Sequence, residues 1–201
     1  IMAVGAIRND GTASNAGHVR VYSWGGTTWT QLGQDIDGEA GGDSSGYSVS
    51  LSSDGKTVAI GAHLNDNIKG HVRVYKYDGV DTWTKLGDDI DGEAISDSSG
   101  FSVSLSSDGT TLAVGAIGND GTASNAGHVR VYSWNGSAWT KLGGDIDGEA
   151  GGDYSGYSVS LSSDGTTLAV GAVRNDGTAS DAGHVRVYSW NGSAWTKLGG
   201  D

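Results

Sequence analysis

Groups of four carboxylates recur three times along the chain at one fixed spacing, a pattern that can bind a cation. Each group places Asp, Asp, Glu and Asp at relative positions 1, 3, 5 and 9. The twelve residues are Asp35, Asp37, Glu39, Asp43, Asp89, Asp91, Glu93, Asp97, Asp145, Asp147, Glu149 and Asp153. Carboxylates spaced in this way, with a Gly among them, can wrap a hard cation such as Ca²⁺ through their oxygen atoms. Calcium is therefore the one cofactor that the sequence suggests.

The same groups have a second interpretation, in which they are solvated acidic connectors between structural units. The spacing starts like an EF-hand loop, but its Gly stands at position 4 instead of 6, and Gly replaces the bidentate Glu of position 12. In this interpretation the apolar residue of each group fills a gap between two units. These residues are Ile36, Ile90 and Ile146. We favour the connector and keep calcium as the alternative.

Large aromatic residues recur at matching positions and could stack on the sugar rings of a glycan. The candidate stacking residues are Trp24, Trp29, Trp134, Trp139, Trp190 and Trp195. In another copy the set is weaker, with Tyr75, Tyr77 and Trp83. Rings of this size also bury the most area when they pack between structural units. We favour packing and keep glycan stacking as the alternative.

Two Asn-Gly-Ser sequences, at Asn135 and Asn191, match the acceptor pattern for N-glycosylation. The same tripeptides suit a hairpin turn, which each copy needs at that place. Single His residues at positions 18, 71, 128 and 184 precede Val-Arg-Val, and no second ligand follows at zinc spacing. We therefore expect turns with possible glycosylation, and no zinc site.

Catalytic motifs are not found in the sequence. An active site needs groups of different roles at one place, whereas similar copies present the same groups repeatedly. No G-x-S-x-G, H-E-x-x-H or phosphate-binding loop is present. The sequence therefore predicts that the chain is not an enzyme.

Internal repeats organise the whole chain, with a period of about 55 residues, the range of propeller and array repeats. The copies are a partial one at residues 1–34 and fuller ones at 35–88, 89–144 and 145–201. In the third copy, alternation and turn residues predict four strands. Their ranges are Phe101–Leu105, Thr111–Ala116, His128–Trp134 and Ala138–Leu142. Asp108-Gly109 predicts a two-residue type I′ hairpin between the first two strands.

Four antiparallel strands per repeat, joined by short hairpins, are typical of a β-propeller blade. The sequence thus predicts an all-β chain of 15 strands, or about 3.75 four-stranded blades. The missing strand is the first of the first blade, because Ile1 lies within the second strand of its copy. We expect the chain to be part of a larger ring or of an assembly.

Three motifs carry a resemblance to a known family. Gly156–Ser160, Leu168–Ala172 and Gly183–Tyr188, with their copies, resemble the FG-GAP repeat of integrin α-subunit propellers and of bacterial or algal secreted repeat proteins. The resemblance implies an extracellular or cell-surface β-propeller for adhesion or ligand binding. The family often places a D-x-D-x-D-G calcium loop between its first two strands. Here that place holds a short hairpin with one carboxylate, as at Ser106–Thr110, so those calcium sites are not expected.

Composition restricts the partners further. The formal net charge is −12, with no Cys, and phosphate-binding proteins need clustered Lys and Arg. We expect no nucleic acid partner and, without an apolar run near 18 residues, no membrane insertion. The expected partners are a protein or glycan ligand, or copies of the chain itself. An alternative function is a structural subunit of an extracellular fibre or surface layer assembled through repeat blades.

Overall fold

Four antiparallel sheets follow one another along the chain in the computed structural model, which describes residues 1–200. Sheet 1 contains β1 (Met2–Ala6), β2 (His18–Trp24), β3 (Trp29–Gln31) and β4 (Ile36–Asp37). Sheet 2 contains β5 (Ser48–Leu51), β6 (Thr57–Ala62), β7 (His71–Tyr77), β8 (Trp83–Lys85) and β9 (Ile90–Asp91). Sheet 3 contains β10 (Ser99–Leu105), β11 (Thr111–Ala116), β12 (His128–Trp134), β13 (Trp139–Lys141) and β14 (Ile146–Asp147). Sheet 4 contains β15 (Ser155–Leu161), β16 (Thr167–Ala172), β17 (His184–Trp190) and β18 (Trp195–Leu198).

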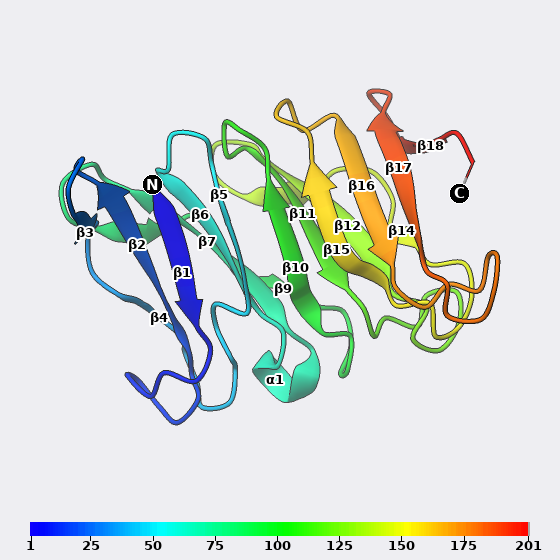
Figure 1. The fold of residues 1–201 in the computed structure, drawn as a ribbon, viewed down its shortest axis with the longest axis horizontal. Helices are drawn as coiled ribbons and strands as arrows, with labels where there is room; N and C mark the ends of the chain where they lie inside the picture. Colours follow the sequence, from blue (N-terminus) through cyan, green and yellow to red (C-terminus); the bar gives the residue numbers. More distant parts are fainter. Residues whose placement is uncertain (201) are drawn as a thin grey trace.

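The sheets stand side by side in sequence order, and sheets 1 and 4 lie at opposite ends of the molecule (Figure 1). Apart from the two-residue strands β9 and β14, each of sheets 2 to 4 has four strands that pair in sequence order, for example β5-β6-β7-β8 in sheet 2. Sheet 1 has three such strands, β1-β2-β3. The described residues therefore form an open row of sheets. No helix among them is long and apolar enough to cross a membrane.

The 15 predicted strands are all present, and two of those predicted in the third copy have the predicted bounds. β11 and β12 match Thr111–Ala116 and His128–Trp134, whereas β10 begins earlier, at Ser99, with a register irregularity before Ser102. Three two-residue strands were not predicted. These are β4, β9 and β14, which pair with β2, β7 and β12. A further unpredicted element is α1 (Asn65–Ile68), in which Asp66 and Asn67 have positive φ.

The turn at Asp108-Gly109 differs from the predicted type I′ turn. Gly109 has a φ of 71°, but Asp108 is not among the residues with positive φ. The Ser106 hydroxyl donates to Asp108 Oδ1 at 2.6 Å, and the Gly109 N–H donates to the Ser106 carbonyl at 3.0 Å. This side-chain bond closes a longer loop, so that only Gly109 needs the left-handed conformation.

The hydrophobic core lies between successive sheets. Val129, Val131 and Ile146 of sheet 3 pack against Leu168 and Val170 of sheet 4. Equivalent residues join sheet 1 to sheet 2 and sheet 2 to sheet 3. The Val-Arg-Val pattern of β12 explains this arrangement, because alternate side chains of a strand point to the same face. Each sheet thus completes the core of its neighbour.

Candidate functional site

The first Asp of each acidic group binds an Arg of the sheet that precedes it, on β2, β7 or β12. Arg20 Nε lies 2.9 Å from Asp35 Oδ1, and Arg130 Nε lies 2.9 Å from Asp145 Oδ1. The hydrogen bond from Arg20 lowers the pKa of Asp35 to about 2, against the effect of burial. Burial alone would raise the pKa of Asp145, but hydrogen bonds from Arg130 and Lys141 lower it to about 2. These carboxylates are charged and paired at neutral pH.

The Glu of each group binds the Arg of the next sheet. The ion pairs are Glu39–Arg73, Glu93–Arg130 and Glu149–Arg186. Arg73 and Arg130 therefore hold two carboxylates each, one from the connector before their sheet and one from the connector after it. The Arg130 side chain is 12% exposed, whereas that of Arg20, which has only Asp35 among these carboxylates, is 42% exposed. The acidic groups thus join neighbouring sheets through shared guanidinium groups.

The last Asp of each group is buried inside the connector. Asp97 Oδ2 accepts hydrogen bonds from the Ala94 N–H at 3.0 Å and from Asn119 Nδ2 at 3.1 Å. Asp43 and Asp153 have the same two kinds of partner. All three residues are 4% exposed. Since each Asn follows the second strand of the next sheet, these carboxylates fix the connector against a loop of that sheet.

The second Asp of each group is exposed, at Asp37, Asp91 and Asp147. His18 Nδ1 lies 3.8 Å from Asp37 Oδ1. Potential ligand atoms within 4.8 Å of one another form three sets among the described residues. They are His18 with Asp35 and Asp37, Glu39 with His71 and Asp89, and Glu93 with His128 and Asp145.

Calcium prefers several oxygen ligands at one point. The four carboxylates of one connector have different partners, and two of them, the first Asp and the Glu, bind Arg side chains. This arrangement does not fit an ion held by all four carboxylates. Each set of neighbouring ligand atoms also includes a His, which offers a nitrogen instead of the oxygen that Ca²⁺ prefers. Burial lowers the pKa of two of these residues, His71 and His128. Calcium binding by these groups stays a prediction.

The six candidate stacking Trp residues form three pairs at the ends of hairpins. Ring centroids are 5.3 Å apart in Trp24–Trp29, 5.5 Å in Trp134–Trp139 and 5.6 Å in Trp190–Trp195. Trp139 Nε1 donates a hydrogen bond to the Leu86 carbonyl of the preceding sheet at 3.0 Å. Trp195 Nε1 donates in the same way to the Leu142 carbonyl, also at 3.0 Å. Two of the pairs therefore lie against a neighbouring sheet. Trp24 and Trp29 are 52% and 47% exposed.

The two Asn-Gly-Ser sequences form exposed hairpin turns. Asn135 Oδ1 accepts hydrogen bonds from the backbone N–H groups of Ser137 and Ala138, both at 3.0 Å. Asn191 makes the same bonds. The turn thus uses the side-chain oxygen, and glycosylation of these Asn residues stays a prediction.

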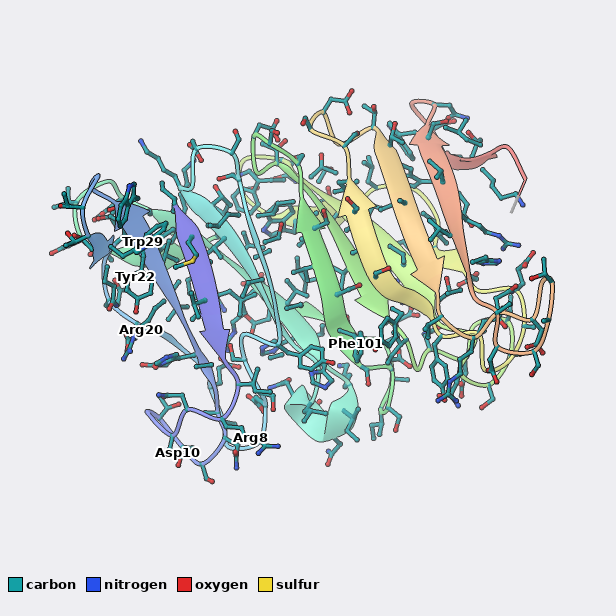
Figure 2. All side chains as sticks on the ribbon, in the orientation of Figure 1. Arg8, Asp10, Arg20, Tyr22, Trp29 and Phe101 are labelled. Atoms are coloured by element: carbon teal, nitrogen blue, oxygen red, sulfur yellow. The ribbon has the colours of Figure 1, made fainter. Side chains whose placement is uncertain are left out.

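A row of aromatic rings crosses three sheets and was missed by the sequence analysis. Tyr47 and Phe101 have ring centroids 5.0 Å apart, and so do Phe101 and Tyr157. Tyr47 is 40% exposed and Tyr157 is 47% exposed. Figure 2 places Phe101 at the end of the sheets where the loop residues Arg8 and Asp10 also lie. We call Tyr47, Phe101 and Tyr157 the aromatic row.

His63 extends the aromatic row, with its ring centroid 4.0 Å from that of Tyr47. Burial lowers the pKa of His63, and its buried Nδ1 has no hydrogen-bond partner in the structure. One signal in the sequence could have revealed the row, because an aromatic residue follows Gly46, Gly100 and Gly156 in the three fuller copies. Period-two reasoning placed these rings on a strand but could not place them next to one another.

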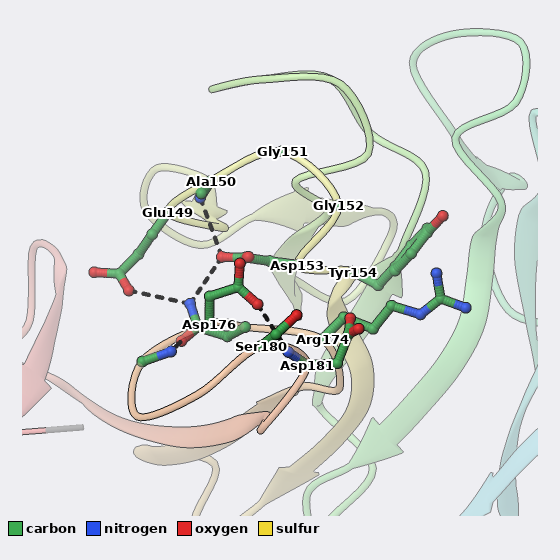
Figure 3. A pocket seen from close by; sticks show the side chains of 12 residues that line it. Glu149, Ala150, Gly151, Gly152, Asp153, Tyr154, Arg174, Asp176, Ser180 and Asp181 are labelled. Atoms are coloured by element: carbon green, nitrogen blue, oxygen red, sulfur yellow. Dashed lines mark hydrogen bonds between the residues drawn. The ribbon is translucent and has the colours of Figure 1, made fainter.

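An open hollow of about 410 Å³ lies beside the aromatic row, between the last acidic connector and the 173–183 loop (Figure 3). Its charged lining residues are Glu149, Asp153, Arg174, Asp176 and Asp181. The Arg174 guanidinium lies 5.1 Å from the ring centroid of Tyr154, the geometry of a cation–π contact. Tyr154 and Arg174 also line an adjoining hollow that reaches Tyr157. The aromatic row therefore borders a polar depression at Tyr157.

Comparison with known proteins gives one family match. The model of the FG-GAP repeat matches residues 146–188, which confirms the resemblance seen in the sequence. A search of curated proteins finds no match.

Two matches among solved structures have low sequence identity. One is titled a "putative 6-phosphogluconolactonase" from Bacteroides uniformis, with a TM-score of 0.57 and 13% identity over 92% of this chain and 51% of that chain. The other is TolB from Acinetobacter baumannii, with a TM-score of 0.47 and 16% identity over 90% of this chain and 40% of that chain. The chain spans about half the length of the first structure and less of the second. The predicted β-propeller class is confirmed, as an open row of four-stranded blades.

The prediction that the chain is not an enzyme needs correction. It relied on the lack of catalytic motifs and on the repetition of the same side chains. A similar structure nevertheless has an enzyme's name in its title, so this fold does not exclude catalysis. At 13% identity the likeness shows the fold alone and assigns no activity to this chain. Residues 146–188 thus match the FG-GAP repeat, and the chain has the fold of successive β-propeller blades.

Proposed function

We propose that the chain is a ligand-binding β-propeller module whose ligand contacts the aromatic row. The observation that carries this proposal is the exposure of Tyr47 and Tyr157 on either side of Phe101, at the loop end of the sheets. Aromatic side chains are enriched in binding interfaces because they bury much area with few rotatable bonds. Loops and strand ends on a rigid scaffold commonly carry binding residues. A protein or a glycan could cover these rings.

An extracellular or cell-surface location is the second part of the proposal. It is supported by the resemblance to the FG-GAP repeat, which implies secretion and adhesion. Fractionation of cells that produce the native protein tests the location directly, and recovery only inside the cells would contradict it.

The binding site can be tested with paired variants. The double variant Tyr47→Ala/Tyr157→Ala removes the exposed part of the aromatic row, and Trp24→Ala/Trp29→Ala removes a comparably exposed pair in sheet 1. Both variants and the wild type would be screened on glycan arrays and on panels of extracellular proteins. We expect the Tyr variant to lose about 30-fold or more in affinity for any ligand found, the effect of removing an interface hot spot. The Trp variant should bind normally, and the reverse result would refute the proposed site.

A further inference from the structure

Two hairpin turns place an Asn side chain beside a Gly backbone nitrogen at the surface. They are Asn135-Gly136 and Asn191-Gly192, and all four residues are exposed. Every other Asn of the chain is followed by Asp, Ala or Ile. In an Asn-Gly pair the Gly nitrogen can attack the carbonyl carbon of the Asn side chain and close a cyclic imide. Whether a pair reacts depends on the groups around that carbonyl and around the nitrogen.

The carbonyl oxygen of each of these Asn side chains is surrounded by hydrogen-bond donors. Asn135 Oδ1 accepts hydrogen bonds from the Ser137 N–H at 3.0 Å, the Ser137 hydroxyl at 2.9 Å and the Ala138 N–H at 3.0 Å. Asn191 Oδ1 accepts the three equivalent bonds at the same distances. Donors placed in this way stabilise the negative charge that develops on a carbonyl oxygen when a nucleophile attacks its carbon. Each turn therefore has the donor arrangement of an oxyanion hole.

The nucleophile of each turn is open to solvent. Among residues 1–200, the N–H groups of Gly136 and Gly192 have no hydrogen-bond acceptor. Nothing lies within 4 Å of a Cβ built on either Gly, so solvent hydroxide can reach the N–H. The nitrogen and the carbonyl carbon that it attacks belong to neighbouring residues, and such proximity raises the rate of an intramolecular reaction. A carbonyl with three donors thus stands next to an unblocked nitrogen.

The second copy shows that a carboxylate fits the same place of a hairpin. There Asp78 stands at the position of Asn135, again followed by Gly, in a slightly longer turn. Its Oδ1 accepts hydrogen bonds at 2.8–3.0 Å from three backbone N–H groups, those of Val80, Asp81 and Thr82. The bonds from Thr82 and Val80 lower the pKa of Asp78, so the carboxylate is charged at neutral pH. Replacement of the Asn amide by a carboxylate is therefore compatible with this kind of turn.

We propose that Asn135 and Asn191 are sites of spontaneous deamidation that their own turns promote. The Gly nitrogen loses its proton to hydroxide and forms a bond to the carbonyl carbon of the Asn side chain. Oδ1 carries the negative charge of the intermediate, held by its three donors. The bond from this carbon to Nδ2 then breaks, and the nitrogen takes a proton from water and leaves as ammonia. Water opens the remaining cyclic imide and gives Asp or isoaspartate.

This reaction goes beyond the proposed ligand binding, because none of its residues belongs to the aromatic row. Reaction at both sites would add two negative charges to the formal net charge of −12. The isoaspartate product also inserts the side-chain methylene group into the backbone of the hairpin, between Trp134 and Trp139 in sheet 3. A glycan on Nδ2 of either Asn would block the reaction, since the same nitrogen has to leave.

Peptide mass mapping of the 201-residue chain after incubation at mildly alkaline pH tests the proposal. Asn119 is the control residue, since its Oδ1 also accepts a backbone N–H, at 2.9 Å, but it is 6% exposed and is followed by Asp120. We expect Asn135 and Asn191 to lose the amide about tenfold faster than Asn119 or more, and an isoaspartate-specific methyltransferase to label both sites. Equal rates at the three residues would overturn the proposal.

Reciprocal Ser variants test the part played by the turn itself. Ser137→Ala removes the hydroxyl donor to Asn135 Oδ1 and keeps the Asn-Gly sequence, while Asn191 serves as the reference in the same molecule. We expect deamidation of Asn135 to slow about threefold or more relative to Asn191, because water replaces an exposed donor only in part. Ser193→Ala should have the reverse effect. Unchanged ratios of the two rates would overturn the proposal, because the Asn-Gly sequence alone would then account for the reaction.

Discussion

Arg130 makes a contact that a surface ion pair does not, because one guanidinium group holds carboxylates from two repeats. It binds Glu93 of the connector before its sheet and Asp145 of the connector after it. Its low exposure removes competing water, and the planar group can satisfy two carboxylates at once. Removal of this cation would leave two like charges near each other at a sheet interface, which costs more than the loss of a solvated pair.

We predict that Arg130→Met lowers the free energy of unfolding by about 1–3 kcal/mol, below the 3–5 typical of fully buried pairs because Glu93 is half exposed. Arg20→Met is the matched control, since Arg20 occupies the same strand position but is 42% exposed. It should cost clearly less than Arg130→Met, because water screens an exposed ion pair. Urea unfolding of the two variants measures the difference. Equal losses would show that the contact between repeats contributes nothing.

At the scale of strands and connectors, the sequence predicted what local chemistry determines. Alternating residues located β11 and β12 correctly, since a half-buried strand needs this period. The turn at Asp108-Gly109 was located correctly but assigned the wrong type, because the Ser106 hydroxyl takes part in it. The two-residue strand β14 carries too few residues to show a period.

The connectors were harder to interpret because their partners lie on strands and loops outside the connector. The spacing of the acidic residues suggested that they act together. In the structure, Asp145, Glu149 and Asp153 instead bind Arg130, Arg186 and Asn175. Linear spacing holds no information about a guanidinium group on the next sheet. The aromatic row was missed for the same reason, since its rings meet only when the sheets stand side by side.

The contact between neighbouring sheets predicts a strong effect of one small substitution. A Cβ on Gly115 would lie 2.1 Å from the Gly156 carbonyl oxygen, a backbone atom of the next sheet. Gly171 has the same place in sheet 4, but its nearest atom is the flexible Ser158 Oγ. We expect Gly115→Ala to lower the free energy of unfolding by about 1–3 kcal/mol or more, as overpacking does. Gly171→Ala should cost less than about 1 kcal/mol.

Thermal and urea unfolding of these two variants would measure the difference. Similar stability of both variants would show that the sheets can separate locally without cost, and that the close approach of the two backbones does not hold them in place.

For the molecule as a whole, the arrangement in a row makes the inner sheets different from the outer ones. Every residue of β6 is buried, and so are five of the six in β11. At the ends the same positions are open, as at Val4, and Val185 is 58% exposed while its equivalent Val129 is fully buried. Repeat arrays gain stability from contacts between neighbours, so a sheet with one neighbour has less than a sheet with two.

We therefore predict a gradient of hydrogen-exchange protection along the chain. The amides of β6 and β11 should exchange most slowly, through global unfolding, whereas those of β1 and β17 should exchange through local opening of the end sheets at lower free energy. Exchange measured by mass spectrometry over the four sheets tests this. The same protection in all four sheets would contradict this prediction. It would mean that the four sheets unfold together as one cooperative unit.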